Sequence, residues 1–266
     1  TPRSTGPARC TARKAAALQA YHEWMPIRTD ANKEVIYRSF DFGNLVSLHM
    51  LDTRLIGREK QLDQTAVLST QAGQDAWKKT DRELLGQTQL AWLQNAMTTS
   101  PGKWQVLGQQ VIMAATWLPV SVQTKFQAYF AKPDASTVGG IKSEVEAYKT
   151  ALRNNDATYF SPVAQAPNPG VPYNFDAWDG YPAAREKVLQ SFVAASAASG
   201  NVKKLVALAG DTHNAWYNNL TLINGTKVGE EFATASVSSP GWESYFPTLI
   251  PEIKSLFQDT TARSNV

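Results

Sequence analysis

The residues best suited to chemistry are Asp211 and His213, which follow a short apolar segment at residues 205–209. Side chains two positions apart in an extended chain point to the same side, so a carboxylate and an imidazole are expected to converge here. Gly210 leaves the backbone room for a sharp turn. This pair of groups suits a metal ion such as Ca²⁺, Mn²⁺, Zn²⁺ or iron. The spacing therefore predicts a metal site at the end of a strand, where α/β proteins also tend to bind ligands.

Two other interpretations apply to the same turn. In one, Asp211 accepts backbone N–H bonds and His213 packs on Trp216, which would make the segment an ordinary solvated turn. In the other, His213 would serve a serine–histidine–aspartate hydrolase. The sequence contains no Gly-x-Ser-x-Gly nucleophile elbow, which argues against the hydrolase. The solvated turn stays open on these residues alone.

Arg54 is a candidate catalytic residue. It lies two positions after Asp52, at the end of a second apolar segment. A guanidinium can bind phosphate oxygens in a bidentate way, which a lysine does less selectively. The alternative is a structural Asp52–Arg54 pair that pins the strand end.

Three further residues are predicted to line a substrate pocket. Gln110 ends an apolar segment, and an amide oxygen is an acceptable ligand for Ca²⁺. Trp178 and Tyr181 lie between a long loop and a helix that begins at Pro182, where their rings could wall the pocket. Asp179, between them, is predicted to cap that helix.

The remaining histidines and two tryptophans are predicted to be packing residues. His22 falls in a predicted helix and His49 in a predicted hairpin strand. Trp92 and Trp104 are expected in the core and not in a platform for stacking nucleic-acid bases.

Helices and strands alternate along the chain, which predicts a layered α/β or α+β fold. Residues 205–209 of the predicted strand 204–209 are continuously apolar, so this strand is expected to be buried on both faces. Residues 57–80 are predicted to be loop, and residues 120–172 are the least regular part. Helices are predicted at residues 8–25, 81–99, 143–153 and 182–199, and strands at 35–42, 45–51, 104–113, 204–209 and 231–238, with hairpin turns at 43–44 and 224–225.

Several phrases resemble the PhoD branch of the calcineurin-like metallophosphoesterases. The turn with Asp211 and His213 is similar to the last ligand motif of that superfamily, in the Gly-Asp-x-His form of PhoD-like phosphatases. The other phrases stand in the family's order at residues 21–28 (YHEWMPIR), 37–40 (YRSF), 50–54 (MLDTR), 85–93 (LGQTQLAWL), 104–110 (WQVLGQQ) and 178–182 (WDGYP) with Arg185. The resemblance covers most of the chain.

The resemblance implies a metallophosphoesterase-type sandwich of mixed β-sheets flanked by helices. Residues 1–266 would be the central and C-terminal part of one catalytic domain, incomplete at its N-terminus because the first metal ligands of the family lie upstream. It implies hydrolysis of phosphate mono- and diesters by a metal-activated hydroxide, with Asp211 and His213 as ligands of Ca²⁺ and a transition metal, most simply Fe³⁺. A branch that uses Zn²⁺ or Mn²⁺ is the enzymatic alternative. A catalytically silent domain that serves as a binding or structural module is the alternative from another class.

Composition limits the other classes of function. Hydrophobic residues make up 43% of the chain and charged residues 18%, the balance of a globular protein. Lys and Arg are scattered and the net charge is only +3, so we expect no nucleic-acid groove. A mild positive balance suits a small anionic substrate, and the resemblance implies that this substrate is a phosphate ester. Cys10 is the single cysteine, and no apolar run is long enough for a membrane span. The first residues lack a signal-peptide pattern, and a periplasmic or extracellular location in a bacterium is implied by the resemblance alone.

Overall fold

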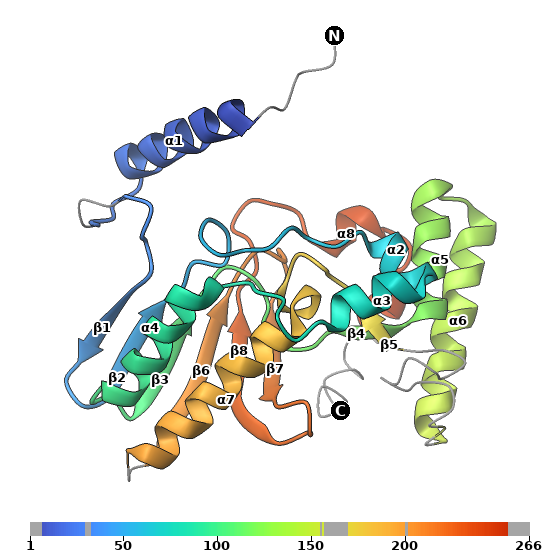
Figure 1. The fold of residues 1–266 in the computed structure, drawn as a ribbon. Helices are drawn as coiled ribbons and strands as arrows, with labels where there is room; N and C mark the ends of the chain where they lie inside the picture. Colours follow the sequence, from blue (N-terminus) through green and yellow to red (C-terminus); the bar gives the residue numbers. More distant parts are fainter. Residues whose placement is uncertain (1–6, 30–32, 155, 157–169, 200–201, 255–266) are drawn as a thin grey trace.

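A six-stranded mixed sheet forms the centre of the molecule (Figure 1). The computed structural model describes residues 7–29, 33–154, 156, 170–199 and 202–254. The strand order is β1-β2-β3-β6-β8-β7. Strands β2, β3, β6 and β8 run parallel to one another, and β1 and β7 are antiparallel edge strands. The strands are β1 (Arg38–Phe42), β2 (Val46–Met50), β3 (Trp104–Gly108), β6 (Lys204–Ala209), β7 (Trp216–Thr221) and β8 (Lys227–Ala233).

Two helices cover one face of this sheet. Helices α4 (Gly86–Thr99) and α7 (Pro182–Ala198) lie side by side in front of the strands in Figure 1. Leu93 of α4 and Leu189 of α7 are fully buried with Leu107 of β3 in one core cluster. Of the apolar positions in α7 that the spacing predicts to face inward, Ala184, Val188, Leu189 and Phe192 are buried, whereas Val193 is 40% exposed. The layered α/β fold is confirmed.

The opposite face of the sheet carries exposed apolar side chains. Leu208 of β6 lies in register with Phe232 of β8, and both are exposed. Buried and exposed residues alternate along β6, so the prediction of burial on both faces is wrong. The same face exposes Phe40, Trp104 and Tyr217. Trp104 is 40% exposed, and the prediction that it lies in the core is wrong as well.

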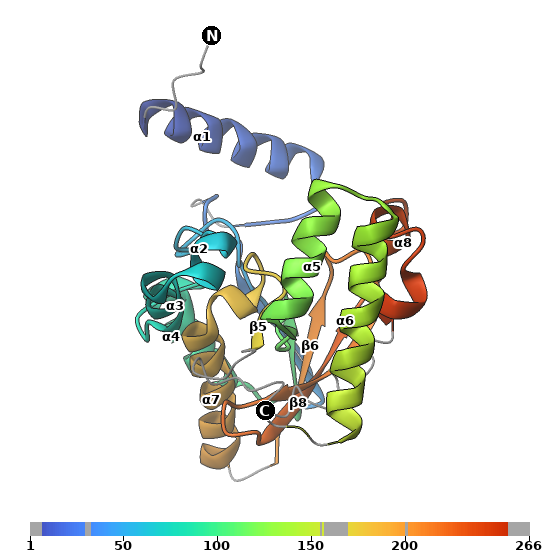
Figure 2. The ribbon, with the colours of Figure 1, turned by 90° about the vertical axis from the view of Figure 1, so that its right-hand side faces the viewer.

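A second, smaller core lies at one end of the molecule. Helices α5 (Val120–Ala131) and α6 (Ala135–Arg153) pack against each other beside the short helix α8 (Trp242–Tyr245) (Figure 2). A two-stranded ribbon of β4 (Trp117–Pro119) and β5 (Gly170–Pro172) lies close by. The sequence pattern located only the second half of α6 and missed α5, whose β-branched residues weaken its helical signal. Of the Pro/Asn/Gly-rich loop predicted at residues 162–172, residues 162–169 lie outside the described residues and the last three form β5.

The predicted hairpins and the first helix are confirmed. Helix α1 (Pro7–Trp24) extends away from the sheet, as both views show (Figures 1 and 2). The β1–β2 and β7–β8 pairs are antiparallel, and their turns contain Gly43 and Gly225 at φ of 57° and 85°. Glycine adopts this left-handed backbone without the steric cost that a Cβ imposes.

Residues 57–80 contain two helices where a loop was predicted. Helices α2 (Gln64–Ser69) and α3 (Gln71–Lys78) are capped by Asp63 and Thr70, whose side chains accept the backbone N–H of Ala66 and Gly73. Helix α4 begins at Gly86 and not at Asp81, because Gly86 has a φ of 73°, which the interior of a right-handed helix does not allow. Among the helices of the described residues, no candidate has the length and apolar character that crossing a bilayer requires.

Candidate functional site

The candidate site lies where the parallel strands end. Strands β2, β3 and β6 finish at Met50, Gly108 and Ala209, and their carboxyl ends share one edge of the sheet because they are parallel. The loops that follow carry Arg54, Gln110 and Asp211. Topology thus brings three of the predicted site segments to the same edge.

Asp211 and His213 follow β6 in an unusual backbone conformation. Their φ angles are 70° and 59°, and they are the only non-glycine residues of the described chain with positive φ. The two-residue spacing suggested an extended chain, but the turn is not extended. Its left-handed positions are Asp211 and His213, and Gly210 is not one of them. Left-handed backbone costs energy in residues with a Cβ and occurs mainly where the surroundings hold it in place, often at functional sites.

The imidazole of His213 is oriented by the backbone. Its Nδ1 lies 3.0 Å from the carbonyl oxygen of Pro240, so Nδ1 carries the proton and Nε2 is left with a lone pair. Metal-binding histidines commonly donate their second ring nitrogen in this way. Trp216 donates its indole N–H to the hydroxyl of Thr212 and contacts the ring of Trp242 edge-on. These contacts do not support the alternative in which His213 packs on Trp216.

Arg54 reaches the Asp211 turn from the loop after β2. Its Nη2 lies 3.6 Å from Asp211 Oδ1, and its Nη1 donates to Asp176 Oδ2 at 2.6 Å. Asp52 is buried and accepts the backbone N–H of Arg54 at 2.8 Å, together with those of Leu55 and Ile56. Asp52 therefore shapes the turn through the backbone and leaves the guanidinium of Arg54 directed toward Asp211.

Gln110 ties the ends of β2 and β3 together. Its Oε1 accepts the backbone N–H and the hydroxyl of Thr53 at 2.9 and 2.6 Å, and its Nε2 donates to the carbonyl of Leu51 at 2.8 Å. A carbonyl oxygen with two donors has used both of its lone pairs. These bonds give Gln110 a structural role in place of the predicted pocket role.

Trp178 and Tyr181 lie in the interior and do not wall an open pocket. Both are fully buried, and Trp178 donates its indole N–H to Gln109. The ring of Tyr181 lies between the guanidinium groups of Arg58 and Arg82, at 5.1 and 4.4 Å. The sequence pattern identified aromatic residues close to the site but could not show that they are enclosed.

Asp179 does not cap α7, because it belongs to the single-turn 3-10 helix η1 (Trp178–Gly180) and points into the protein. Its carboxylate accepts the backbone N–H and the hydroxyl of Thr116, both at 2.7 Å, and the indole N–H of Trp117. Burial raises the pKa of Asp179, and these hydrogen bonds act in the opposite direction. Asp179 fixes the loop that follows β3.

Glu231 is a buried carboxylate that the sequence pattern did not single out. It accepts the backbone N–H groups of Met113 and Ala114 at 2.6 and 2.9 Å and the amide of Asn218 at 3.2 Å. Burial raises its pKa. Its only sequence signal is an acidic residue at an inward position of a strand. Glu231 and Asp179 together hold the loop between β3 and β4.

Of the remaining histidines, His49 is fully buried and bonds to Ser39 and Gln105, which confirms its packing role. His22 bonds to Leu18 of its own helix and to Thr29, and it is partly buried. Neither lies in the loops at the carboxyl ends of the parallel strands.

As metal ligands, Asp211 and His213 would form only an incomplete set. Within the residues that the structure describes, no group of three or more His, Cys, Asp and Glu could hold a metal ion. The donor types fit a metal, since one carboxylate and one oriented imidazole are available. Ca²⁺ takes about six to eight oxygen ligands, so these two side chains could supply only part of a site.

Comparisons with known proteins identify the family of the chain. The sequence profile described as "PhoD-like phosphatase" matches residues 2–264. The chain belongs to the PhoD-like phosphatase family. It is 32% identical over 237 residues to alkaline phosphatase D of Bacillus subtilis (strain 168), a match that covers 86% of this chain and 31% of that protein.

The fold is also similar to a solved PhoD structure. The chain superposes on the protein titled "Structure of PhoD" with a TM-score of 0.57 and 27% identity, over 90% of this chain and 37% of that one. The PhoD-like chain thus spans about a third of the length of these relatives.

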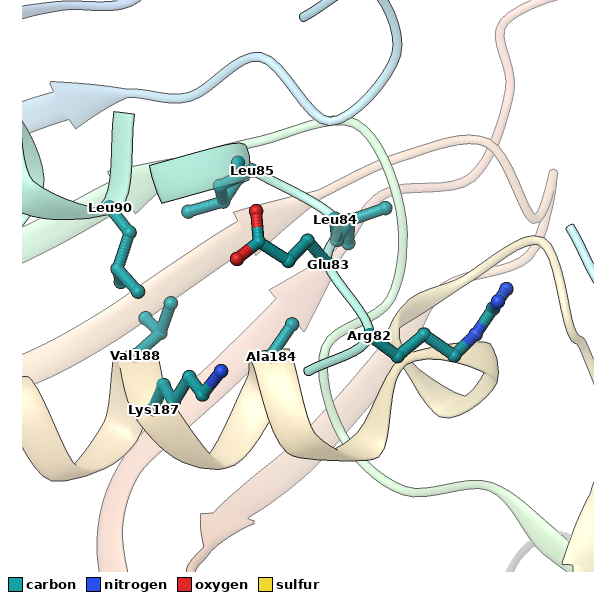
Figure 3. A pocket seen from close by; sticks show the side chains of 9 residues that line it. Arg82, Glu83, Leu84, Leu85, Leu90, Ala184, Lys187 and Val188 are labelled. Carbon is teal, nitrogen blue, oxygen red and sulfur yellow. The ribbon is translucent and has the colours of Figure 1, made fainter. Parts of the chain in front are cut away.

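A small pocket between α4 and α7 is separate from this site. Figure 3 shows Leu90 and Val188 facing each other across it, with Glu83 and Lys187 at its border. None of its lining residues belongs to the loops of Arg54 or Asp211. Its lining comes from α7, the start of α4 and the segment at residues 82–85 of the PhoD-like chain.

Proposed function

We propose that this chain supplies the Asp211, His213 and Arg54 portion of an active site that hydrolyses phosphate mono- and diesters. The observation that carries the proposal is the turn at residues 210–213, at the carboxyl edge of the sheet, where the carboxylate of Asp211 faces Arg54 and the carbonyl of Pro240 orients the imidazole of His213. Membership of the PhoD-like phosphatase family supports the reaction class. Residues 1–266 would form the central and C-terminal part of a single catalytic domain.

In this proposal Asp211 and the Nε2 atom of His213 are metal ligands. The metals would be Ca²⁺ and a transition metal, with iron preferred over Zn²⁺ or Mn²⁺, in a bacterial protein that acts in the periplasm or outside the cell. When bound, the metals would supply Lewis acidity that activates a water-derived nucleophile and neutralises charge on the phosphate. Pro240 holds the ring of His213 so that its Nε2 lone pair is available.

Arg54 is proposed to contact the phosphate oxygens of the substrate. In the structure its Nη2 faces Asp211, so the carboxylate and the guanidinium balance each other's charge. A cation bound to Asp211 would weaken that attraction and leave Nη2 for a phosphate oxygen. The exposed position of Arg54, with 39% of its side chain accessible, suits contact with a small substrate.

The test is the metal content of the full-length protein, measured by elemental mass spectrometry, together with hydrolysis of p-nitrophenyl phosphate and bis-p-nitrophenyl phosphate. Asp211→Ala is expected to lower both the metal content and the activity. Asp75→Ala is the matched control, because Asp75 is an exposed carboxylate on α3 bonded only within its helix to Gln71. Unchanged metal content and activity in Asp211→Ala would refute the proposal. A metal-free, inactive full-length protein would instead favour a catalytically silent module.

A further inference from the structure

Asp176 connects two arginines at the border of the candidate site. Its Oδ2 accepts Nη1 of Arg54 at 2.6 Å, and its Oδ1 accepts Nη2 of Arg58 at 2.5 Å. Asp176 lies in the loop between β5 and η1, more than a hundred residues along the chain from both arginines. A bridge between such distant segments fixes their relative position.

Arg58 is the fixed side of this bridge. Its side chain is only 12% exposed, and it also donates to the backbone carbonyls of Thr53 and Asp176. Its guanidinium lies over the ring of Tyr181. With these contacts Arg58 is held too firmly to follow a substrate, and it anchors the carboxylate of Asp176.

Arg54 is the exposed side of the bridge, with 39% of its side chain accessible. Its guanidinium spans two carboxylates, with Nη1 on Asp176 and Nη2 toward Asp211. A long exposed arginine loses rotamer freedom when it is held in one place, so an arginine that is held beforehand binds an anion at lower entropic cost. Without Asp176, Asp211 would be the nearest remaining carboxylate, and Arg54 would pair with the proposed metal ligand.

We propose that Asp176 is a positioning residue for phosphate-ester binding. Its carboxylate, anchored by Arg58, holds Nη1 of Arg54 so that Nη2 stays beside Asp211 and faces the substrate. Asp176 acts through Arg54 and does not itself contact the phosphate. This inference rests on the function proposed above.

The test uses the full-length protein with p-nitrophenyl phosphate as substrate and inorganic phosphate as competitive inhibitor. For Asp176→Asn, KM and the inhibition constant of phosphate are each expected to rise about tenfold, as when a charge-assisted hydrogen bond is weakened. The turnover number kcat and the metal content should stay close to those of the wild type. Asp176→Glu keeps the charge and should lose less phosphate affinity. Asp75→Asn serves as the control away from the site.

A double-mutant cycle separates positioning from a general structural role. If Asp176 acts through Arg54, then Asp176→Asn adds nothing to the loss already caused by Arg54→Ala. Additive losses would overturn the inference, as would an unchanged KM and phosphate inhibition constant in Asp176→Asn. A loss of metal from Asp176→Asn, or a fall in kcat at constant KM, would overturn it too. Asp211→Ala tests the proposed function independently, so the two failures remain distinguishable.

Discussion

The Nδ1 atom of His213 lies 3.0 Å from the carbonyl oxygen of Pro240, so a backbone group 27 residues further along the chain orients the imidazole. The same histidine has a φ of 59°, as Asp211 has a φ of 70°. Both candidate ligands therefore stand on strained backbone that the surrounding structure must hold in place. Two independent features therefore set the position of His213: the hydrogen bond of its ring to Pro240 and the left-handed conformation of its main chain.

These two features predict different outcomes for two substitutions at residue 213. His213→Asn and His213→Val both remove the imidazole, so each is expected to lower metal content equally. Asparagine tolerates left-handed backbone, whereas a β-branched residue does not. We expect His213→Val to lower the free energy of unfolding by about 1–2 kcal/mol more than His213→Asn, measured by urea denaturation of metal-free protein. Equal stabilities would show that the left-handed conformation is not retained in solution.

Removing the buried carboxylate of Glu231 is expected to lower the stability of the fold strongly. Glu231→Ala would leave the buried N–H groups of Met113 and Ala114 without an acceptor. We expect a loss of about 3 kcal/mol or more in the free energy of unfolding, and a smaller loss for Glu231→Gln, which keeps one acceptor oxygen. Glu230→Gln is the control in the same strand, because 38% of the Glu230 side chain is accessible and its pair with Lys227 lies at the surface, so the change should matter little. A similar loss for the substitutions at 230 and 231 would contradict the assignment.

The parts of the fold with strong local signals were predictable from the sequence. The apolar segment before Gly210, the helix that begins at Pro182 and the Asn224–Gly225 turn appear where the pattern placed them. The family phrases also identified Asp211 and Arg54, which the fold brings to 3.6 Å of each other. Local periodicity and motif spacing carry this information because they depend on neighbouring residues only.

The parts that depend on distant contacts were not predictable. Trp104 resembles a core residue in the sequence, yet it lies on the face of the sheet that α4 and α7 do not cover. Asp176 and Arg58 are 118 residues apart and neither has a motif of its own, so only the fold reveals their pairing. Asp179 could be taken for a helix cap because nothing local shows that its carboxylate is directed toward Thr116.

The buried histidine His49 is expected to make the free energy of unfolding depend on pH. Burial lowers its pKa below the ordinary value of about 6.5, and the Gln105 bond and the charge of Asp41 oppose that effect while Lys203 adds to it. As the pH falls, the unfolded chain protonates His49 at a higher pH than the folded protein does. The stability that comes from burying the neutral imidazole is therefore complete above about pH 6.5 and is lost as the pH falls toward the folded-state pKa.

The comparison that tests this effect is wild type against His49→Gln. The free energy of unfolding of the wild type should fall more steeply between pH 7.5 and about pH 5 than that of the variant. Carboxylates and the other two histidines titrate in both proteins and cancel in the difference. Parallel pH profiles would mean that His49 titrates alike in the folded and unfolded chains.

Gly57 lies in the loop of Arg54 and Arg58 and packs closely against the backbone at the start of α4. Its φ is 80°, and a Cβ placed there would lie 2.4 Å from the carbonyl oxygen of Leu85 and 2.5 Å from the backbone nitrogen of Gly86. Backbone atoms cannot move aside as a flexible side chain would, so Gly57→Ala combines left-handed strain with a clash. We expect it to lower the free energy of unfolding by at least about 2 kcal/mol and to raise KM by displacing Arg54.

The matched control is Gly139→Ala. Gly139 lies within α6 and is far in the sequence from the arginine loop. A Cβ added at this residue would have no atom outside its own helix within 4 Å. Alanine is the better helix former there, so this variant is expected to gain up to about 1 kcal/mol and to keep its KM. Urea denaturation and steady-state kinetics of both variants in the full-length protein separate the two predictions. If Gly57→Ala loses stability but keeps the wild-type KM, the close approach of Gly57 and Gly86 supports the fold without positioning Arg54.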